Sequence, residues 1–279
     1  FSQITYLLAS GKEQFINILH TQNIKPNWNF GFEYRLVSAP GFFQTQNTGH
    51  NNYRLFSNYQ GKKKRYAVWF VLSGNKLSAS ENGGIQNDSL LYAPNREKRV
   101  SIPVNLGGDV STSFNVFSTK ISTGNIYKEF TLFLKQSYDI GKRDSVQIND
   151  STKEYLFYPK FRFQHTISYT GLGYKFSDRV KGFDKTGKRY AEMDSLLFKH
   201  WYDTAIVIDN VGLLNFQVED KWKILTNDFS IRQFPETKNP AQFIEAGLRF
   251  ENLKGIFARA TKNYYNVAIH GDYINKTKN

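Results

Sequence analysis

The sequence of 279 residues contains no cysteine. Disulfides, thiolate metal sites and a cysteine nucleophile are therefore excluded. Long apolar runs are also missing: the densest one, residues 66–72 (YAVWFVL), is far shorter than the ~20 residues that a membrane-spanning helix needs. The chain is therefore not a helical membrane protein.

The sequence also lacks the common catalytic and nucleotide-binding motifs. It contains no GxxxxGK[ST], HExxH, GxSxG or GxGxxG pattern. The five histidines are scattered without the spacing of metal ligands. His165 lies on the apolar side of its predicted strand, where we expect a satisfied or interfacial histidine rather than a ligand. The sequence predicts neither an enzyme nor a cofactor or metal site.

The chain is rich in segments in which bulky and polar residues alternate. In residues 28–37 (WNFGFEYRLV), Trp28, Phe30, Phe32 and Tyr34 alternate with smaller or polar residues. Successive side chains of a strand point to opposite faces, so one face is apolar and the other polar. In a soluble sheet these faces meet a core and water. In a membrane barrel they meet lipid and a wet lumen.

The whole chain repeats this pattern, and helical periodicity is nearly absent. We expect roughly 10–14 antiparallel strands of about 8–13 residues in a single β domain over residues 1–279. Short turns alternate with long polar loops near 80–99 and 141–158, and residues 177–200 are irregular. We also expect a strand at 110–119, shorter strand-like pieces at 201–208, 213–220 and 221–231, and a turn at 252–255. Strands of this length, with aromatic residues near their ends, favour an all-β transmembrane barrel over a soluble sandwich.

The alternation assigns side chains to the two sides of the barrel. The polar side chains expected to line the lumen and set its selectivity are Glu33, Arg35, Glu129, Lys135, Arg162, Gln164, Glu245, Arg249 and Glu251. The aromatic side chains expected to face lipid or to form girdles are Trp28, Phe30, Phe32, Tyr34, Phe161, Phe163 and Tyr169. Carboxylates could do acid–base chemistry, but the basic residues on the same side make a charge-balanced lumen the simpler interpretation.

The formal net charge is +13, which raises nucleic acids and anionic surfaces as partners. The basic residues are spread along the chain, however, and the one tight cluster, residues 62–65, lies in a predicted turn. A solvated turn is the ordinary interpretation of such a cluster. We therefore expect no nucleic acid partner. The excess of lysine and arginine predicts a mild anion preference if that excess lies in the lumen.

Several segments resemble the putative porin family of Bacteroidetes outer membranes. They are EQFINILHTQNIKPNWNFGFEYRLVS (13–38), GFFQTQ (41–46), NKLSASENGGI (75–85), IPVNL (102–106) and AGLRFENLKGIFARATKNYY (246–265). The resemblance implies an outer-membrane β-barrel that acts as a diffusion channel. Family members are longer and the chain ends in INKTKN without a terminal aromatic residue. We therefore expect a partial barrel.

Our leading hypothesis is an outer-membrane porin, a passive channel for small hydrophilic solutes, in contact with outer-membrane lipid. The first alternative is a non-conducting barrel that serves as a subunit of a larger surface or secretion complex, with other outer-membrane proteins as partners. The second is a soluble, secreted β-sandwich that binds carbohydrate on its aromatic residues.

Overall fold

One antiparallel sheet makes up nearly all of the structure. The computed structural model describes residues 1–106, 121, 123–149, 152–179, 207–208, 214–257 and 260–275. Its strands are β1 (Ser2–Leu8), β2 (Gln14–Lys25), β3 (Trp28–Ala39), β4 (Thr48–Gln60), β5 (Tyr66–Ser80), β6 (Gly124–Asn149), β7 (Thr152–Arg179), β8 (Val207–Ile208), β9 (Leu214–Gln233), β10 (Phe243–Phe257) and β11 (Ala260–Ile274). The expected all-β antiparallel fold is confirmed.

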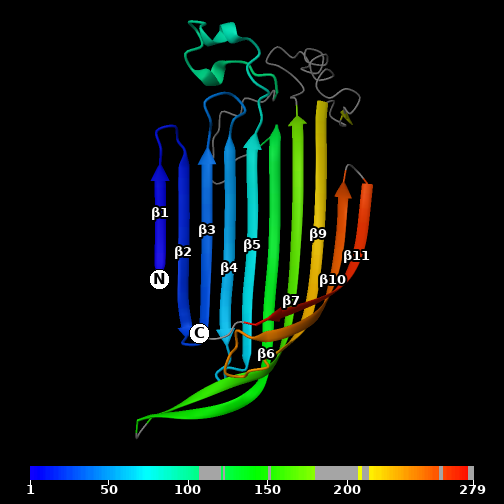
Figure 1. The fold of residues 1–279 in the computed structure, drawn as a ribbon. Helices are drawn as coiled ribbons and strands as arrows, with labels where there is room; N and C mark the ends of the chain where they lie inside the picture. The colour runs from blue at the N-terminus through cyan, green and yellow to red at the C-terminus, as the bar shows by residue number, and fades with distance from the viewer. Residues whose placement is uncertain are drawn as a thin grey trace.

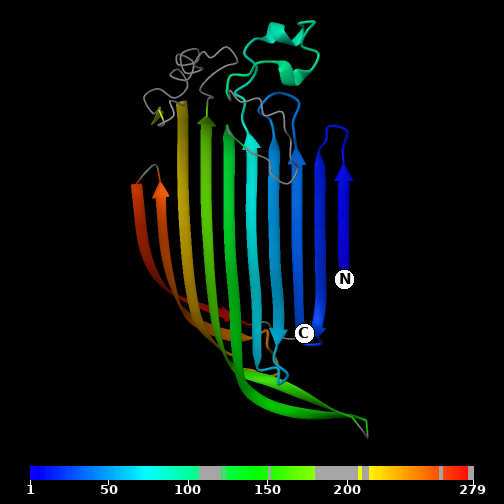
Figure 2. The ribbon, with the colours of Figure 1, turned by 180° about the vertical axis from the view of Figure 1, so that it is seen from behind.

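The strands follow one another in the sheet almost in chain order. Hydrogen bonds join β1-β2-β3-β4-β5-β6-β7-β9-β10-β11, and the short β8 pairs with β9 (Figure 1). This meander arises because each strand pairs with its neighbour through a local connection. Within the described residues β1 and β11 each pair on one side only, so the sheet is open, as the view from behind also shows (Figure 2).

The connections differ between the two ends of the strands. At one end, residues 81–123 join β5 to β6 and residues 180–213 separate β7 from β9, and the shorter connections 9–13, 40–47 and 258–259 lie at the same end. The part 81–106 carries two 3₁₀ helices, η1 (Asp88–Leu91) and η2 (Arg99–Ser101), and no strand. At the other end, strands are joined by residues 26–27, 61–65, 150–151 and 234–242. These are called the long-loop end and the short-turn end below.

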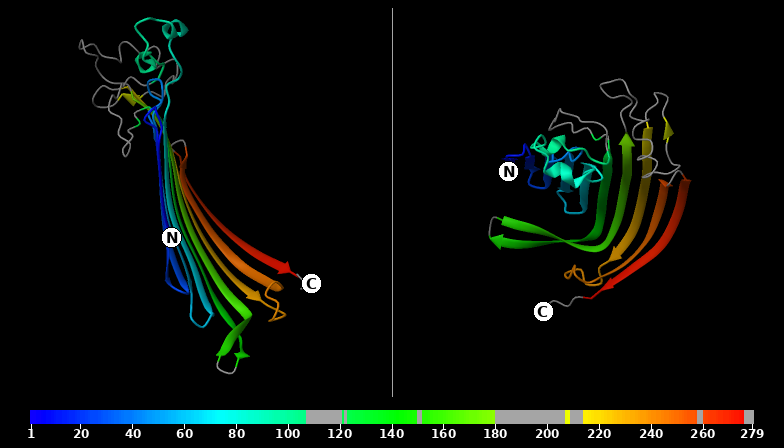
Figure 3. Two further views of the ribbon diagram at one scale, coloured as in Figure 1. Left: turned by 90° about the vertical axis from the view of Figure 1, so that its left-hand side faces the viewer. Right: turned by 90° about the horizontal axis from the view of Figure 1, so that it is seen from above.

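The sheet has almost no hydrophobic core. Among the described residues only Leu36, Ile102, Val104 and Phe234 are buried hydrophobic side chains. Many large apolar side chains are instead exposed, such as Ile269 at 84%. Figure 3 shows the single layer bent into an open trough. A soluble sandwich would bury one face of each sheet against the other, so this arrangement does not fit the sandwich hypothesis.

The predicted loop at 141–158 is wrong. Strands β6 and β7 run through this segment, and their pairing continues past an irregularity at Ile140/Gly141 as far as Asn149 and Thr152. Here the two strands project beyond the sheet as a hairpin (Figure 1). Because this part of the hairpin has no neighbouring strand, neither of its faces needs to be apolar. Its polar sequence therefore resembles a loop.

Two further boundaries differ from the sequence prediction. Residues 213–220 and 221–231, predicted as separate pieces, form the single strand β9. The predicted turn at 252–255 lies inside β10, whose pairing with β9 is unbroken. The strand predicted at 110–119, residues 180–200 of the predicted irregular region and most of the piece at 201–208 lie outside the described residues.

Candidate functional site

One face of the sheet carries most of its ion pairs and is called the polar face, although Trp69 and Phe133 also lie on it. The other face is mainly apolar. Directly opposed residues share a face, and the pairs Arg35–Asn52, Asn52–Asn75 and Asn75–Glu129 follow one face from β3 to β6. The same alternation continues to β11. All nine side chains predicted to line a lumen lie on this polar face: Glu33, Arg35, Glu129, Lys135, Arg162, Gln164, Glu245, Arg249 and Glu251.

The first group on the polar face is the Glu33 cluster, on β3 to β6. Glu33 pairs with Arg54 at 2.7 Å and with Arg35 at 3.3 Å. Beside them Asn52 donates to Asn75 at 2.7 Å, and Asn75 donates to the Glu129 carboxylate at 3.1 Å. A pocket of about 450 Å³ opens over Glu33, both arginines and both asparagines. Both arginine side chains are about half exposed, so their charges remain accessible.

The second group is the Arg162 cluster, on β6 to β11 near the short-turn end. Arg162 donates to both oxygens of Asp139 at 2.7 and 2.8 Å, a fork geometry that favours the charged pair. On the same row of directly opposed residues, Arg232 pairs with Glu245 at 2.6 Å. Arg162 also lies over the ring of Phe234, at 5.6 Å from its centroid. The two arginines are directly opposite each other, and each has a carboxylate on its other side.

Asp228 adds a third acidic member to the Arg162 cluster. Its carboxylate accepts from Arg249 at 2.9 Å and lies 3.1 Å from Nε2 of His270. The three side chains come from β9, β10 and β11, so the cluster ties together the last strands of the sheet. The charges of Asp228 and Arg249 compensate each other on the polar face.

Several carboxylates on the polar face are more buried than large apolar side chains on the other face. Asp139 and Glu245 are only 9% and 7% exposed. On the apolar face, Phe229 and Ile231 are each 51% exposed. Side chains converge on the concave side of a bent sheet and spread apart on its convex side. We infer that the polar face is the inside of the trough in Figure 3.

Three predicted lumen residues lie on the polar face outside these clusters. Lys135, Gln164 and Glu251 form no ion pair within the described part of the chain. Sequence reasoning missed four members of the two clusters, which supply most of the ion-pair partners there: Arg54, Asp139, Asp228 and Arg232. The alternation in residues 51–60 would have identified Arg54. Asp228 and Arg232 were missed because β9 was divided into separate pieces.

The opposite face is apolar and aromatic. All seven predicted lipid-facing or girdle residues lie on it: Trp28, Phe30, Phe32, Tyr34, Phe161, Phe163 and Tyr169. At the short-turn end, Trp28 and Tyr59 meet edge-on at 6.5 Å between ring centroids, and Tyr59 and Tyr66 lie 6.4 Å apart. Trp28 also donates its indole N–H to Ser57 at 3.0 Å. Aromatic rings with one polar end suit a membrane–water boundary.

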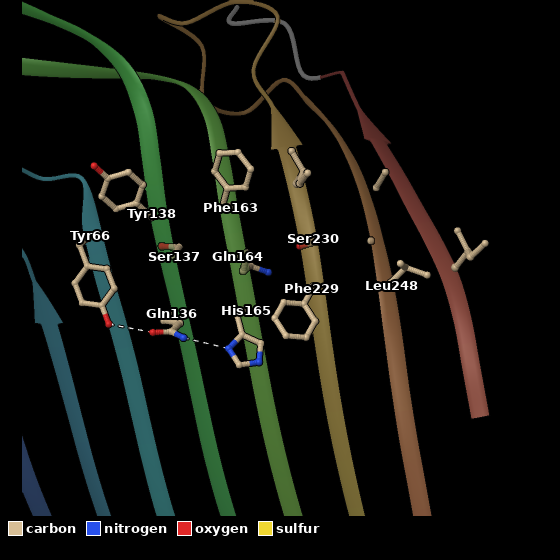
Figure 4. Close-up of a pocket in the computed structure, with 14 residues that line it drawn as sticks. Tyr66, Gln136, Ser137, Tyr138, Phe163, Gln164, His165, Phe229, Ser230 and Leu248 are labelled. Atoms are coloured by element: carbon tan, nitrogen blue, oxygen red, sulfur yellow. Dashed lines mark hydrogen bonds between the residues drawn. The ribbon is translucent and has the colours of Figure 1, made fainter. Parts of the chain in front are cut away.

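A groove of about 810 Å³ crosses the apolar face from β5 to β11 (Figure 4). Along one side Tyr66 donates to Gln136 at 3.1 Å, and Gln136 contacts Nδ1 of His165 at 3.1 Å. The His165 ring stacks on Phe229 at 4.2 Å. This contact network gives the histidine a structural partner on each side.

Neither a metal cluster nor a helical membrane span is found in the described ranges. No group of three or more His, Asp or Glu side chains is placed there to hold a metal ion. Among the same residues, no helix has the length and apolar character required to cross a bilayer.

Residues 1–278 match the family described as putative porin. The chain belongs to this family. The match covers nearly the whole sequence, including the two clusters and all described strands. No curated protein matches the chain.

Membership of the putative porin family places the chain among outer-membrane β-barrel channels. The family resemblance derived from the sequence is thereby confirmed, whereas its restriction to Bacteroidetes stays a prediction. An outer-membrane location implies contact with the lipid of that membrane.

Proposed function

We propose that the sheet is the wall of a passive channel for small hydrophilic solutes in the bacterial outer membrane. The polar face lines its water-filled lumen, and the apolar face contacts lipid. The observation that carries this proposal is the contrast between the two faces. Charged, ion-paired side chains occupy the inner face, whereas large apolar side chains are exposed on the outer face. Nothing in this mechanism requires catalysis.

The apolar face has the dimensions of a membrane band. Aromatic residues near the short-turn end include Trp28 and Tyr138, and those nearer the long-loop end include Tyr34 and Phe130. Their sequence separations of six positions on β3 and eight on β6 correspond to roughly 20–26 Å along the strands. This approaches the apolar band of about 25 Å in outer-membrane barrels. Long loops face outward in such barrels, so the long-loop end is extracellular.

The charges on the polar face predict weak selectivity. Outside the projecting hairpin, the basic side chains on this face of the described strands are Arg35, Arg54, Lys135, Arg162, Arg232, Arg249 and Lys262. The acidic ones are Glu33, Glu129, Asp139, Asp178, Asp220, Asp228, Glu245, Glu251 and Asp272. The basic excess of the sequence is therefore not on this face. The condition for an anion preference is not met here, and we expect a slight cation preference.

Planar-bilayer recording of the full-length protein tests the proposal. We expect steps of conductance and, under a potassium chloride gradient, a reversal potential that gives a K⁺ to Cl⁻ permeability ratio of about 1–3. A protein that inserts but never conducts would overturn the channel proposal and favour the scaffold alternative. Strong anion preference would contradict the assignment of the polar face to the lumen.

A further inference from the structure

Lysines gather on the apolar face near the long-loop end. The residues of this lysine belt are Lys76, Lys128, Lys175, Lys221, Lys223 and Lys254. Lys76 of β5 lies directly opposite Lys128 of β6, and Lys223 of β9 lies directly opposite Lys254 of β10. The belt therefore crosses the sheet from β5 to β10. Its members come from strands that are far apart in the sequence.

The positive charge of the belt is almost uncompensated. Glu219 shares this face, pairs with Lys221 at 2.8 Å and lies directly opposite Lys175, so one acid faces two of the six lysines. Within the described residues Lys76, Lys128 and Lys223 have no ion-pair partner, and the same holds for Lys254. Residues directly opposite in an antiparallel pair have Cβ atoms about 5 Å apart, and like charges there destabilise the sheet. Most charged side chains of the two clusters on the polar face have a partner of opposite charge, so this run of lysines with a single acid requires a separate explanation.

The belt lies where the apolar face ends. Toward the short-turn end, Lys128 is followed on the same face by Phe130 and Leu132, and Lys223 is followed by Leu225. On β5, Leu72 follows Lys76 after Gly74. Tyr169 and Phe250 continue this apolar surface on β7 and β10. In the orientation proposed above, the leucines contact acyl chains and the lysines lie at the headgroups of the outer leaflet. A ligand that fits both parts has anionic groups joined to hydrocarbon.

We propose that the lysine belt binds the phosphate groups of outer-leaflet lipids. Each ammonium group supplies a point charge for a phosphate oxygen, and bound phosphates would remove the repulsion between opposed lysines. The acyl chains of the same lipids pack on the leucines below. A free phosphate ion would satisfy only the charged part. This inference rests on the proposed outer-membrane orientation of the sheet.

Lipid retention measured by native mass spectrometry tests the belt. Full-length protein in detergent is mixed with phosphatidic acid or with diacylglycerol, which differ only in the phosphate. The test variant carries Lys76→Gln, Lys128→Gln, Lys223→Gln and Lys254→Gln. The control removes the same number of charges from exposed positions at the short-turn end, with Lys25→Gln, Lys62→Gln, Lys63→Gln and Lys64→Gln.

We expect the wild-type protein and the control to retain phosphatidic acid over diacylglycerol. The belt variant should bind phosphatidic acid at least about tenfold more weakly, because each lysine near an anionic membrane surface contributes to attraction. Unchanged retention in the belt variant would overturn the proposal, because the lysines then merely extend into the surrounding water. An equal loss in the control would also overturn it, since net charge alone would then explain binding.

A second measurement distinguishes failure of the proposed function from failure of the lysine-belt proposal. A gel comparison of heated and unheated samples reports whether each variant forms a barrel that persists in detergent. Wild-type protein without a heat-dependent shift contradicts the barrel itself. A normal shift with equal retention of the two lipids contradicts only the lysine belt.

Discussion

At the scale of single residues, the two faces treat charge in opposite ways. On the polar face Glu33 lies between Arg35 and Arg54, and Asp228 lies between Arg249 and His270. Such exposed or half-exposed pairs add little to stability. Their role in a channel is to fix the position and net charge of side chains that a passing ion encounters. In the proposed channel, selectivity would therefore depend on individual carboxylates.

Glu33→Gln is expected to shift ion selectivity toward anions. The substitution keeps the size of the side chain but removes the charge that compensates two arginines, both about half exposed. The permeability ratio of K⁺ to Cl⁻, measured from reversal potentials, should fall by about twofold or more.

Glu97→Gln is the matched control for Glu33→Gln. Glu97 is exposed in the segment between β5 and β6 and lies outside the polar face. It loses the same charge and should leave the permeability ratio within error of wild type. If both variants shift the ratio equally, the Glu33 cluster does not line the conduction path.

At the scale of strands, glycines hold aromatic rings against the sheet. The Tyr53 ring on β4 covers Gly74 on β5, its direct neighbour across the strands. A Cβ added at Gly74 would lie 2.3 Å from Cζ of Tyr53. Any side chain at this position must therefore displace the ring. This close approach explains a glycine inside a strand where it is otherwise unfavourable.

Gly74→Ala is expected to destabilise the sheet. Displacing the Tyr53 ring should cost about 1–3 kcal/mol, as overpacking does elsewhere. The loss is measured as a lower urea midpoint for unfolding in lipid vesicles. Gly173→Ala on β7 is the control, because a Cβ there has no neighbour within 4 Å. Equal midpoints for the two variants would show that the ring moves aside freely.

Alternation within each strand made the face of each side chain predictable from the sequence. The ion-pair partners on neighbouring strands were not predictable. Arg162 and Gln164 were assigned correctly to one face because alternation within a strand requires no knowledge of neighbours. The pairing of Arg162 with Asp139 depends on the register between two strands, which the sequence does not display. The hairpin at 141–158 was missed for a related reason. Its two strands pair only with each other, so its residues lack the apolar and polar alternation on which the prediction relied.

At the scale of the whole molecule, an open layer without a core needs a special environment. An apolar face with Phe163 at 44% and Phe229 at 51% exposure would drive association in water. Lipid accommodates such a face without a second layer. Hydrocarbon does not accommodate unpaired backbone groups, so in a membrane the edges of β1 and β11 have to be paired. The family match and the absence of a core therefore lead to the same architecture.

Cysteine labelling in lipid vesicles tests the central claim, that the polar face meets water and the apolar face meets lipid. The chain has no cysteine of its own, so single substitutions are unambiguous. Ser168→Cys and Ile167→Cys are adjacent on β7 and both side chains are half-buried, but they lie on opposite faces. A charged, water-soluble maleimide should label Ser168→Cys and leave Ile167→Cys unmodified in the folded protein. Equal labelling, or labelling of Ile167→Cys alone, would contradict the account.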